Sequence, residues 1–470
     1  MVQYDARMKN ETSINTEQLT RLFAEEVDLF TKSHPRAMQL AERAGASLVG
    51  RVPMSWMQRW ASPFPPYAAS AHGAEIIDVD GLTYLDFALG DTAAMAGHAP
   101  AAVVRAISEQ IAQGSTTMLP SEAAIDAAEE LARRFGVPLW QLCLTATDAN
   151  RFVLRIARAI TKRPKVLVHN WCYHGTVDET FAIARSGGKA GAAESRPGNI
   201  GPQVDPATTT RVVEINDLAA TEAALAAGDV AAILIEPALT NIGIVLPDPG
   251  YHTELRKLAT AYGALLIIDE THTISMGPGG ATAAWGLDPD LLVIGKAIAG
   301  GLPGAAFGMK RHIADQFGQQ LQLDQIDTGG IGGTVSGSVL SAVAIRATLH
   351  EVLTSAIFPD MIAGSNRWAV GADEVFTRRG VQWSVTQLGA RAEYHFTAEP
   401  PRNGGEAAAA AHHEMERFLH LHALNRGVIM TPFHNMALFS PATPLAAADR
   451  HSEVLDDAIA ALIAGGALTV

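Results

Sequence analysis

The sequence predicts an α/β protein with a mainly parallel sheet and a separate, smaller α+β lobe. Helical stretches alternate with short apolar runs between about residues 100 and 310, the runs being 165–169, 231–237, 264–270 and 291–296. Such alternation is typical of βα units, in which helices cover both faces of a parallel sheet. The 470 residues, 48% of them hydrophobic, suffice for a large core and favour two or three lobes.

The segments on either side of this region predict the second lobe. Residues 17–46 carry apolar side chains at helical spacing and are expected to form an N-terminal arm. The stretch GAEIIDVDGLTYLDF (73–87) alternates apolar and polar residues around an Asp-Gly turn, which predicts a hairpin. Helices are expected at 336–355, 363–378 and 408–426, with strands in WSVTQLGARAEYHF (383–396). We therefore expect an arm and part of the small domain in 1–90, a large domain in 91–345 and a C-terminal small domain in 346–470.

Charge and hydropathy limit the function classes. The formal net charge is -14 and basic residues form no cluster, which argues against a nucleic-acid or anionic-membrane surface. No apolar run approaches the roughly 18 residues of a membrane span, and the N-terminus is too polar for a secretion signal. We expect a cytoplasmic protein whose partners are small molecules.

Three of the four apolar runs end in a chemically reactive residue: Glu236, Asp269 and Lys296. Ligands of an open parallel sheet gather beyond the carboxyl ends of its strands. A carboxylate there costs several kcal/mol unless a cation meets it. Lys296 is flanked by small residues, and a lysine partly removed from water can form a Schiff base with a carbonyl. A Schiff-base lysine with an acidic partner for a pyridinium nitrogen is the pattern of pyridoxal phosphate (PLP) sites.

Six motifs follow one another along the chain: DVDGLTYLDF with GHAP (97–100), CYHG (172–175), IEPAL (235–239), IIDET (267–271), IGKAIAGGLP (294–303) and GGTVSGS (332–338). In these motifs and their order the chain resembles the class III aminotransferases of PLP fold type I. The chain most resembles the branch that contains glutamate-1-semialdehyde aminomutase and the β-amino-acid and amine transaminases. The resemblance implies fold type I, with a seven-stranded, mainly parallel sheet in the large domain. It also implies a PLP-dependent transaminase, with an aminomutase or an amino-acid racemase as alternatives.

The resemblance assigns roles around the cofactor ring. Lys296 would hold the cofactor as a Schiff base and, once released, move the proton between substrate and cofactor. Asp269 would keep the pyridine nitrogen protonated. Tyr173 would stack on one face of the ring and Thr271 would pack against the other. Glu236 and Glu270 each follow an apolar run. They either support the residues that contact the cofactor or cap the ends of their strands.

A second group of residues is expected at the cofactor phosphate. LTATDAN (144–150) lies between an apolar strand and a helix, and the unpaired amides of a helix N-terminus bind phosphate. The resemblance places Thr145, Ala146 and Thr147 there, with Ala146 where the family usually has glycine. Thr334 matches a threonine that relatives supply from the neighbouring subunit, which implies a homodimer with shared active sites.

The substrate side departs from the relatives that act on amino acids. Trp56 and His434 stand at the two positions where such relatives carry a carboxylate-binding arginine. Two arginines could bind a substrate carboxylate instead. Arg59 lies one helical turn from Trp56, and Arg391 lies on an alternating strand with Glu393 as its partner. The alternative interpretation is that both arginines face solvent. We expect an aromatic-lined pocket for amino donors without an α-carboxylate, with a keto acid or aldehyde as the other substrate.

Other classes of protein fit less well. A Rossmann oxidoreductase would share the alternating pattern, but no GxGxxG follows a first strand, and Lys296 would have no role. A metal-dependent hydrolase could use Asp269, Glu270 and His272, yet adjacent residues on a strand point to opposite faces. We therefore expect no metal site. A non-catalytic homologue is disfavoured by the presence of both Lys296 and Asp269.

Overall fold

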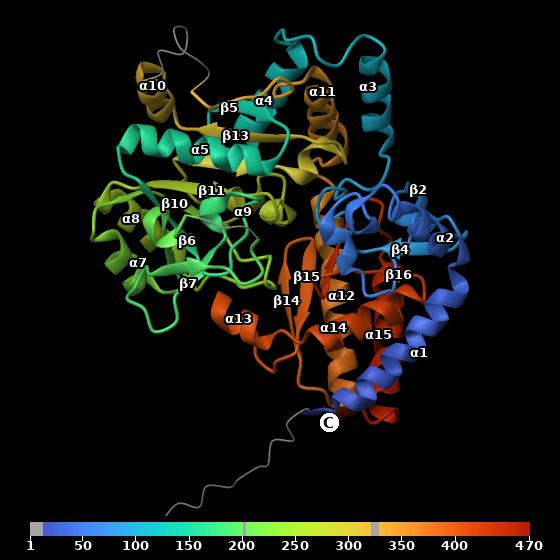
Figure 1. Ribbon diagram of the computed structural model, residues 1–470. Helices are drawn as coiled ribbons and strands as arrows, with labels where there is room; N and C mark the ends of the chain where they lie inside the picture. Colours follow the sequence, from blue (N-terminus) through green and yellow to red (C-terminus); the bar gives the residue numbers. More distant parts are fainter. Residues whose placement is uncertain (1–12, 201–203, 321–328) are drawn as a thin grey trace, which may run out of the picture.

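A seven-stranded sheet forms the centre of the computed structural model, which describes residues 13–200, 204–320 and 329–470 (Figure 1). Every neighbouring pair in it is parallel except the two pairs that β13 makes. The prediction of a mainly parallel, seven-stranded sheet is thus confirmed. In spatial order the strands are β5 (Leu139–Cys143), β13 (Ala305–Met309), β12 (Leu291–Ile294), β11 (Leu265–Asp269), β10 (Val230–Ile235), β6 (Lys165–His169) and β9 (Thr210–Val213).

The apolar runs are continuous because both faces of this sheet are covered. Along β12, Leu292 and Ile294 enter one buried core, whereas Leu291 and Val293 enter another on the opposite face. Side chains alternate between faces along a strand, so a strand buried on both sides needs apolar residues throughout. The helices of this half are α3 (Ala101–Ile111), α4 (Glu122–Phe135), α5 (Ala146–Thr161), α6 (Pro206–Thr209), α7 (Leu218–Leu225), α8 (Tyr251–Tyr262), α9 (Gly280–Ala284), α10 (Arg311–Gln320) and α11 (Val339–Ala347).

The second half of the molecule combines both ends of the chain. Figure 1 shows the blue N-terminal elements beside the orange and red C-terminal ones, with α1 packed on α14. The helices of this second half are α1 (Thr16–Ser33), α2 (Pro35–Ala44), α12 (Phe358–Arg379), α13 (Gly404–Ala410), α14 (His413–Leu424) and α15 (Ala446–Ala464). The expected single helix of the arm is interrupted at His34, because Pro35 restricts the residue before it and begins a new helix.

Small sheets complete this half. The expected hairpin is present, with its turn at Asp80 and Gly81. One sheet joins β16 (Val428–Ile429), β4 (Thr83–Asp86), β3 (Glu75–Asp78) and β2 (Ala68–His72), and another joins β14 (Ser384–Leu388), β15 (Arg391–His395) and β17 (Met436–Leu438). Two-stranded pairs are β1 (Ser13–Ile14) with β18 (Leu468–Thr469), and β7 (Ala182–Ala184) with β8 (Ala193–Ser195).

Within the described ranges, no helix is long and apolar enough to cross a membrane. The cytoplasmic location and the domain boundaries after residues 90 and 345 stay predictions.

Candidate active site

Lys296 lies at the carboxyl end of β12, where the chain turns into a short 3-10 helix, η5 (Lys296–Ala299). Its backbone φ is +49°, a left-handed conformation that is uncommon for residues other than glycine. The Lys296 Nζ donates a hydrogen bond to Asp91 Oδ2 at 2.6 Å, and it lies 2.9 Å from His272 Nε2. The segment after β4, which carries Asp91, and the segment after β11, which carries His272, therefore hold the amine.

His272 is a neutral imidazole between two cationic side chains. Burial, together with the charges of Lys296 and Arg391, lowers the pKa of His272 well below its usual value, although Asp91 acts in the opposite direction. Because the ring is neutral, one of its nitrogens can accept a hydrogen bond: Nε2 faces the Lys296 amine, and the other nitrogen is Nδ1. That nitrogen lies 3.0 Å from Thr92 Oγ1.

Asp269, the last residue of β11, is a buried and ionised carboxylate. Its Oδ2 accepts hydrogen bonds from Asn150 Nδ2 at 2.8 Å and His174 Nδ1 at 3.0 Å, and its Oδ1 accepts one from the Thr271 amide at 3.1 Å. Burial opposes the charge, but His174, with the hydrogen bonds from Thr271 and Asn150, holds the pKa of Asp269 below its usual value. Burial likewise opposes a charge on His174, yet the nearby Asp269 carboxylate helps to raise the pKa of that imidazole.

The N-terminus of α5 lies beside the lysine. Thr145 caps the helix, its Oγ1 accepting from the Asp148 amide at 3.1 Å. Ala146 is the first helical residue and has no positive φ, so the position needs no glycine. Gly295, just before Lys296, is so near that an added Cβ would lie 3.0 Å from the Ala146 Cβ. No hydrogen bond from the Ala146 or Thr147 amide is found among the described residues, which leaves both free for an anion.

A turn following β6 closes the other side of this helix end. Gly175 has a φ of +75°, and an added Cβ would collide with Thr147. The Thr176 amide donates to Thr147 Oγ1 at 3.0 Å, and the Tyr173 amide donates to Glu236 Oε1 at 3.1 Å. Glu236, after β10, thus fixes the turn that carries Tyr173.

Two further residues that the sequence places at the site, Glu270 and Thr334, do not line the cavity. Glu270 is turned away from Lys296 and accepts hydrogen bonds from Thr273 Oγ1 and from the amides of Ala281 and Thr282, so it caps the start of α9. The side chains of Asp269 and Glu270 thus point to different parts of the molecule. Among the described residues, no three His, Cys, Asp or Glu side chains lie together as metal ligands. Thr334 is exposed and does not line the cavity of its own chain.

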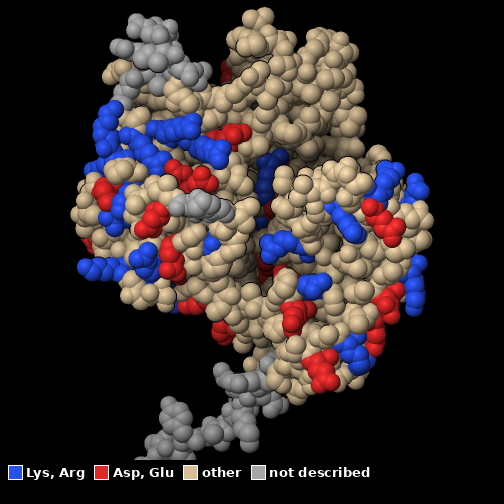
Figure 2. Space-filling model, in the orientation of Figure 1, with Lys and Arg blue, Asp and Glu red and all other residues tan. Residues whose placement is uncertain are grey.

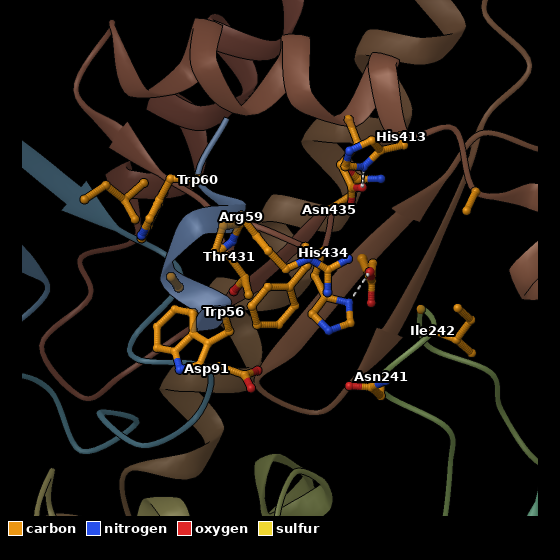
Figure 3. A pocket seen from close by; sticks show the side chains of 18 of the residues that line it. Trp56, Arg59, Trp60, Asp91, Asn241, Ile242, His413, Thr431, His434 and Asn435 are labelled. Atoms are coloured by element: carbon orange, nitrogen blue, oxygen red, sulfur yellow. Dashed lines mark ion pairs between the residues drawn. The ribbon is translucent and has the colours of Figure 1, made fainter. Parts of the chain in front are cut away.

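A cavity of about 1170 Å³ opens in front of Lys296, in the hollow between the two halves that Figure 2 shows. Lys296, Asp91 and Tyr173 line it, and aromatic side chains contribute much of its wall: Trp56, Trp60, Trp171, Phe181 and Phe433. Figure 3 shows Trp56 and Arg59 on the same side of the cavity, near His434. The Trp56 ring meets Phe433 edge-on at 6.2 Å, and the Arg59 guanidinium lies 5.4 Å from the centre of the Phe433 ring.

Glu393 and Glu416 also line the cavity. Glu393 Oε1 lies 3.3 Å from His434 Nδ1, and the pKa of His434 is raised because this carboxylate outweighs the effect of burial. Burial, with help from Glu393, raises the pKa of Glu416 to about 7, although His434 and Arg59 act in the opposite direction. Polar groups therefore lie beside the aromatic ones, since the His434 ring is 5.1 Å from that of Phe433.

Arg391 is buried rather than exposed to the cavity. All five residues of β15 are buried, so neither face of the strand is solvated. Glu393 and His395 line the cavity, whereas Arg391 donates to Thr92 Oγ1 at 2.6 Å and lies 3.2 Å from His272 Nδ1. The expected resting partner, Glu393, is instead paired with His434.

The sequence reasoning missed several residues of the site: Asp91, Thr92, Asn150, His174, Arg196 and the role of His272. Asn150 and His174 lie inside motifs that were recognised, LTATDAN and CYHG, and those motifs were the available signal. Asp91 and Thr92 belong to a segment of positive φ after a hairpin, and no periodicity marks such a segment.

These residues fit PLP. The structure brings together an amine, a buried ionised carboxylate, a helix N-terminus with free amides and an aromatic residue, Tyr173. In addition, the Thr271 Oγ1 is buried without a hydrogen-bond partner among the described residues. Each is a group that a phosphorylated pyridine aldehyde requires.

Comparison with known proteins agrees with this geometry. Residues 56–463 match the family described as Aminotransferase class-III. A glutamate-1-semialdehyde 2,1-aminomutase of Roseiflexus castenholzii is 34% identical over 379 residues, covering 80% of this chain and 85% of the relative.

Two solved structures are similar over most of the chain. A glutamate-1-semialdehyde-aminomutase from Pseudomonas aeruginosa PAO1 has a TM-score of 0.93 and 44% identity, covering 96% of this chain and 99% of that one. A lysine-to-alanine form of the same protein was solved in complex with PMP. An omega-transaminase from Sphaerobacter thermophilus has a TM-score of 0.80 and 28% identity, with coverage of 90% and 97%.

The resemblance found in the sequence motifs is thereby confirmed, as are the cofactor and the enzyme class. The chain belongs to the class III aminotransferases and is a PLP-dependent enzyme of fold type I.

Proposed function

We propose that this aminotransferase takes an amino group from a donor amine without an α-carboxylate and passes it to a keto acid or an aldehyde. The observation that carries the proposal is the wall in front of Lys296, where Trp56, Phe181 and Phe433 offer apolar surface to an amine substituent. Arg391, the arginine best placed in sequence to bind an α-carboxylate, is buried, donates to Thr92 and does not line the cavity.

PLP, when bound, supplies an aldehyde that can carry the amino group and a pyridinium ring that withdraws electrons from the substrate carbon. Lys296 would hold the cofactor at its Nζ and, once displaced, would move the proton on the substrate carbon. Asp91 and His272 orient that Nζ from two sides in the structure. Asp269, ionised and fixed by Asn150 and His174, would keep a proton on the pyridine nitrogen.

The remaining predicted cofactor residues would enclose the ring and the phosphate. Tyr173 and Thr271 would pack against the ring faces. The free amides at the start of α5, those of Ala146 and Thr147, would bind the phosphate, with Thr145 capping the helix. Glu236 would act indirectly, by fixing the turn of Tyr173.

The active unit would be a homodimer. Large apolar side chains are exposed on α3, on α4 and between them: Val104, Ile111, Met118, Leu119 and Ile125. The upper part of the molecule, where Figure 1 places α3, α4 and α11, shows few charged side chains in Figure 2. Ser338 Oγ donates to the Ser115 carbonyl at 3.1 Å, which joins the Thr334 loop to this apolar surface. A second copy on this surface would bring Thr334 to its partner's phosphate site.

Matched donors test the substrate proposal. An amine and the amino acid that yields it on decarboxylation are compared in the first half-reaction, in which the donor bleaches the yellow cofactor. We expect the amine to be used at least as efficiently as the amino acid. A preference of about a hundredfold or more for the amino acid, lost in Arg391→Ala or Arg59→Ala, would replace the amine proposal with an amino-acid transaminase.

An aminomutase is the second candidate, because curated relatives at 31–34% identity and the 44% identical structure carry that name. An aminomutase moves the amino group within one substrate and needs no separate acceptor. Glutamate-1-semialdehyde supplied alone therefore discriminates the two. Its complete conversion to an isomeric amino acid, without any keto acid, would favour the aminomutase.

A further inference from the structure

Arg196 is a partly buried arginine in the wall of the active-site cavity. It follows β8, and it lines the cavity together with Lys296 and Tyr173. Its Nη2 donates to the Cys172 carbonyl at 2.6 Å, and its guanidinium lies 5.2 Å from the centre of the Trp171 ring. These contacts, both to the turn that carries Tyr173, fix the direction of the side chain.

The charge of Arg196 is not matched by an anion. Among the described residues, the contacts of the guanidinium are the Cys172 carbonyl and the Trp171 ring rather than a carboxylate, and its Nε is buried without an acceptor. Burial lowers the pKa of Arg196, against the influence of Cys172, Glu236 and Tyr173, but a guanidinium stays charged in proteins. Glu236 lies nearby, yet it is hydrogen-bonded to the Tyr173 amide and to Thr240. A buried cation with unused donors is costly unless a ligand pairs with it.

We propose that Arg196 binds the carboxylate of the keto-acid substrate and so determines which acceptors the enzyme uses. The planar guanidinium matches a carboxylate with two parallel hydrogen bonds, and its contacts with the Cys172 carbonyl and the Trp171 ring hold it at the cavity wall. This inference rests on the proposed function, in which the donor amine lacks a carboxylate and the acceptor carries one.

Neither of the other arginines considered for this task is placed as well. Arg391 is wholly buried and does not line the cavity. Arg59 is exposed and lies over the Phe433 ring, in the part of the wall that Figure 3 shows beside Trp56 and His434. Arg196 is instead attached to the turn of Tyr173, the residue expected to stack on the cofactor.

The test compares two acceptors that differ by the carboxylate alone, pyruvate and acetaldehyde, with the wild-type holoenzyme and with Arg196→Met. The variant should lose about 100-fold in kcat/KM with pyruvate, about 2.7 kcal/mol. Its kcat/KM with acetaldehyde and its bleaching by the donor amine should stay within about twofold, well under 1 kcal/mol on the same scale. Arg196→Gln, which retains a donor for the Cys172 carbonyl, is measured beside it in case the methionine variant does not fold.

Arg185→Met is the matched control. Arg185 belongs to the same connecting segment, is half-exposed and does not line the cavity, so its variant should keep wild-type kinetics with both acceptors. A second measurement avoids turnover: propionate and the uncharged propionamide are titrated into the holoenzyme while the visible absorption of the cofactor is followed. The Arg196 variants should lose affinity for propionate only.

Equal losses with pyruvate and acetaldehyde would overturn the proposal, since they would reflect a general disturbance of the site. Unchanged pyruvate kinetics or unchanged propionate binding would overturn it as well, since the carboxylate would then be bound elsewhere. Failure of the proposed function gives a different result: the wild-type enzyme would not be bleached by the donor amine, whatever residue stands at position 196.

Discussion

Lys296 combines an unusual backbone conformation with two polar contacts to its amine, and it contributes little to the buried core. We expect Lys296→Ala to remove the yellow colour of the bound cofactor and to reduce turnover by about 1000-fold or more, about 4 kcal/mol. The fold should persist, because the substitution keeps the Cβ and removes only the rest of a side chain that is 27% exposed. Circular dichroism and thermal unfolding check the fold. Substantial turnover by the purified variant would refute the assignment of the lysine.

The carboxylate of Asp269 should matter through its charge. Asp269→Asn keeps the shape but offers an amide beside the Asn150 and His174 donors, so a pyridinium would lose its partner. We expect proton abstraction from the substrate carbon to slow by orders of magnitude, each factor of ten being about 1.4 kcal/mol. Single-turnover absorbance with a deuterated donor isolates that step. A rate within about threefold of wild type, well under 1 kcal/mol, would show that the carboxylate serves another purpose.

The sequence identifies the residues whose surroundings are local. Asp269 and Lys296 could be found because each ends an apolar strand, and the position of a strand follows from its own few residues. Arg196 and Asp91 could not, because their roles depend on where distant segments meet: Asp91 reaches Lys296 across 205 residues of chain. Arg391 was open to two interpretations in sequence, and the packing of β15 on α12 and β17 decides its burial.

At the scale of a helix, Glu416 on α14 links the cavity to the stability of the fold. Its pKa is raised to about 7, so between about pH 4.5 and 7 the folded state holds a proton that the unfolded state releases. The free energy of unfolding should therefore fall as the pH rises through that range. We expect Glu416→Gln to be more stable than wild type at pH 8, by up to about 3 kcal/mol, and by much less at pH 5.

Urea unfolding at the two pH values measures this difference. Glu414→Gln is the matched control, since Glu414 lies two residues away on the same helix and is exposed. If Glu416→Gln gave the same change in unfolding free energy at both pH values, the proton would not be linked to folding.

Elements with strong local signals were predicted well, and interrupted ones less so. α8 shows such a signal, because glycines at 250 and 263 delimit the helix at 251–262. The arm was expected as one helix, but its division at Pro35 follows from a local restriction that the apolar spacing does not reveal. The strands at 384–388 and 391–395 were recognised, whereas the burial of both faces of the second depends on neighbours from the rest of the fold.

At the scale of the whole molecule, the apolar surface around α3 and α4 should hold two copies together. We expect the wild-type enzyme to have twice the monomer mass in light scattering and Leu119→Asp, at a side chain that is 71% exposed, to yield monomers. The monomer should also lose PLP more readily on dialysis, because Thr334 of a second copy would no longer reach the phosphate. Val49→Asp is the control, because the Val49 side chain is 95% exposed but belongs to neither α3, α4 nor the segment between them. A Leu119→Asp dimer with normal PLP retention would place the interface elsewhere.

β13, which is antiparallel to its two neighbours in the seven-stranded sheet, has a consequence for the ribosome-bound chain. β5 lies at the sheet edge and pairs with β13 alone, so the strand at residues 139–143 finds no partner until residues 305–309 have been synthesised. The helix that follows β5 carries the phosphate site, and Lys296 also precedes β13 by only a few residues. A nascent chain released before residue 305 therefore has an unpaired edge and no assembled place for a cofactor, which makes truncated products targets for chaperones and proteases.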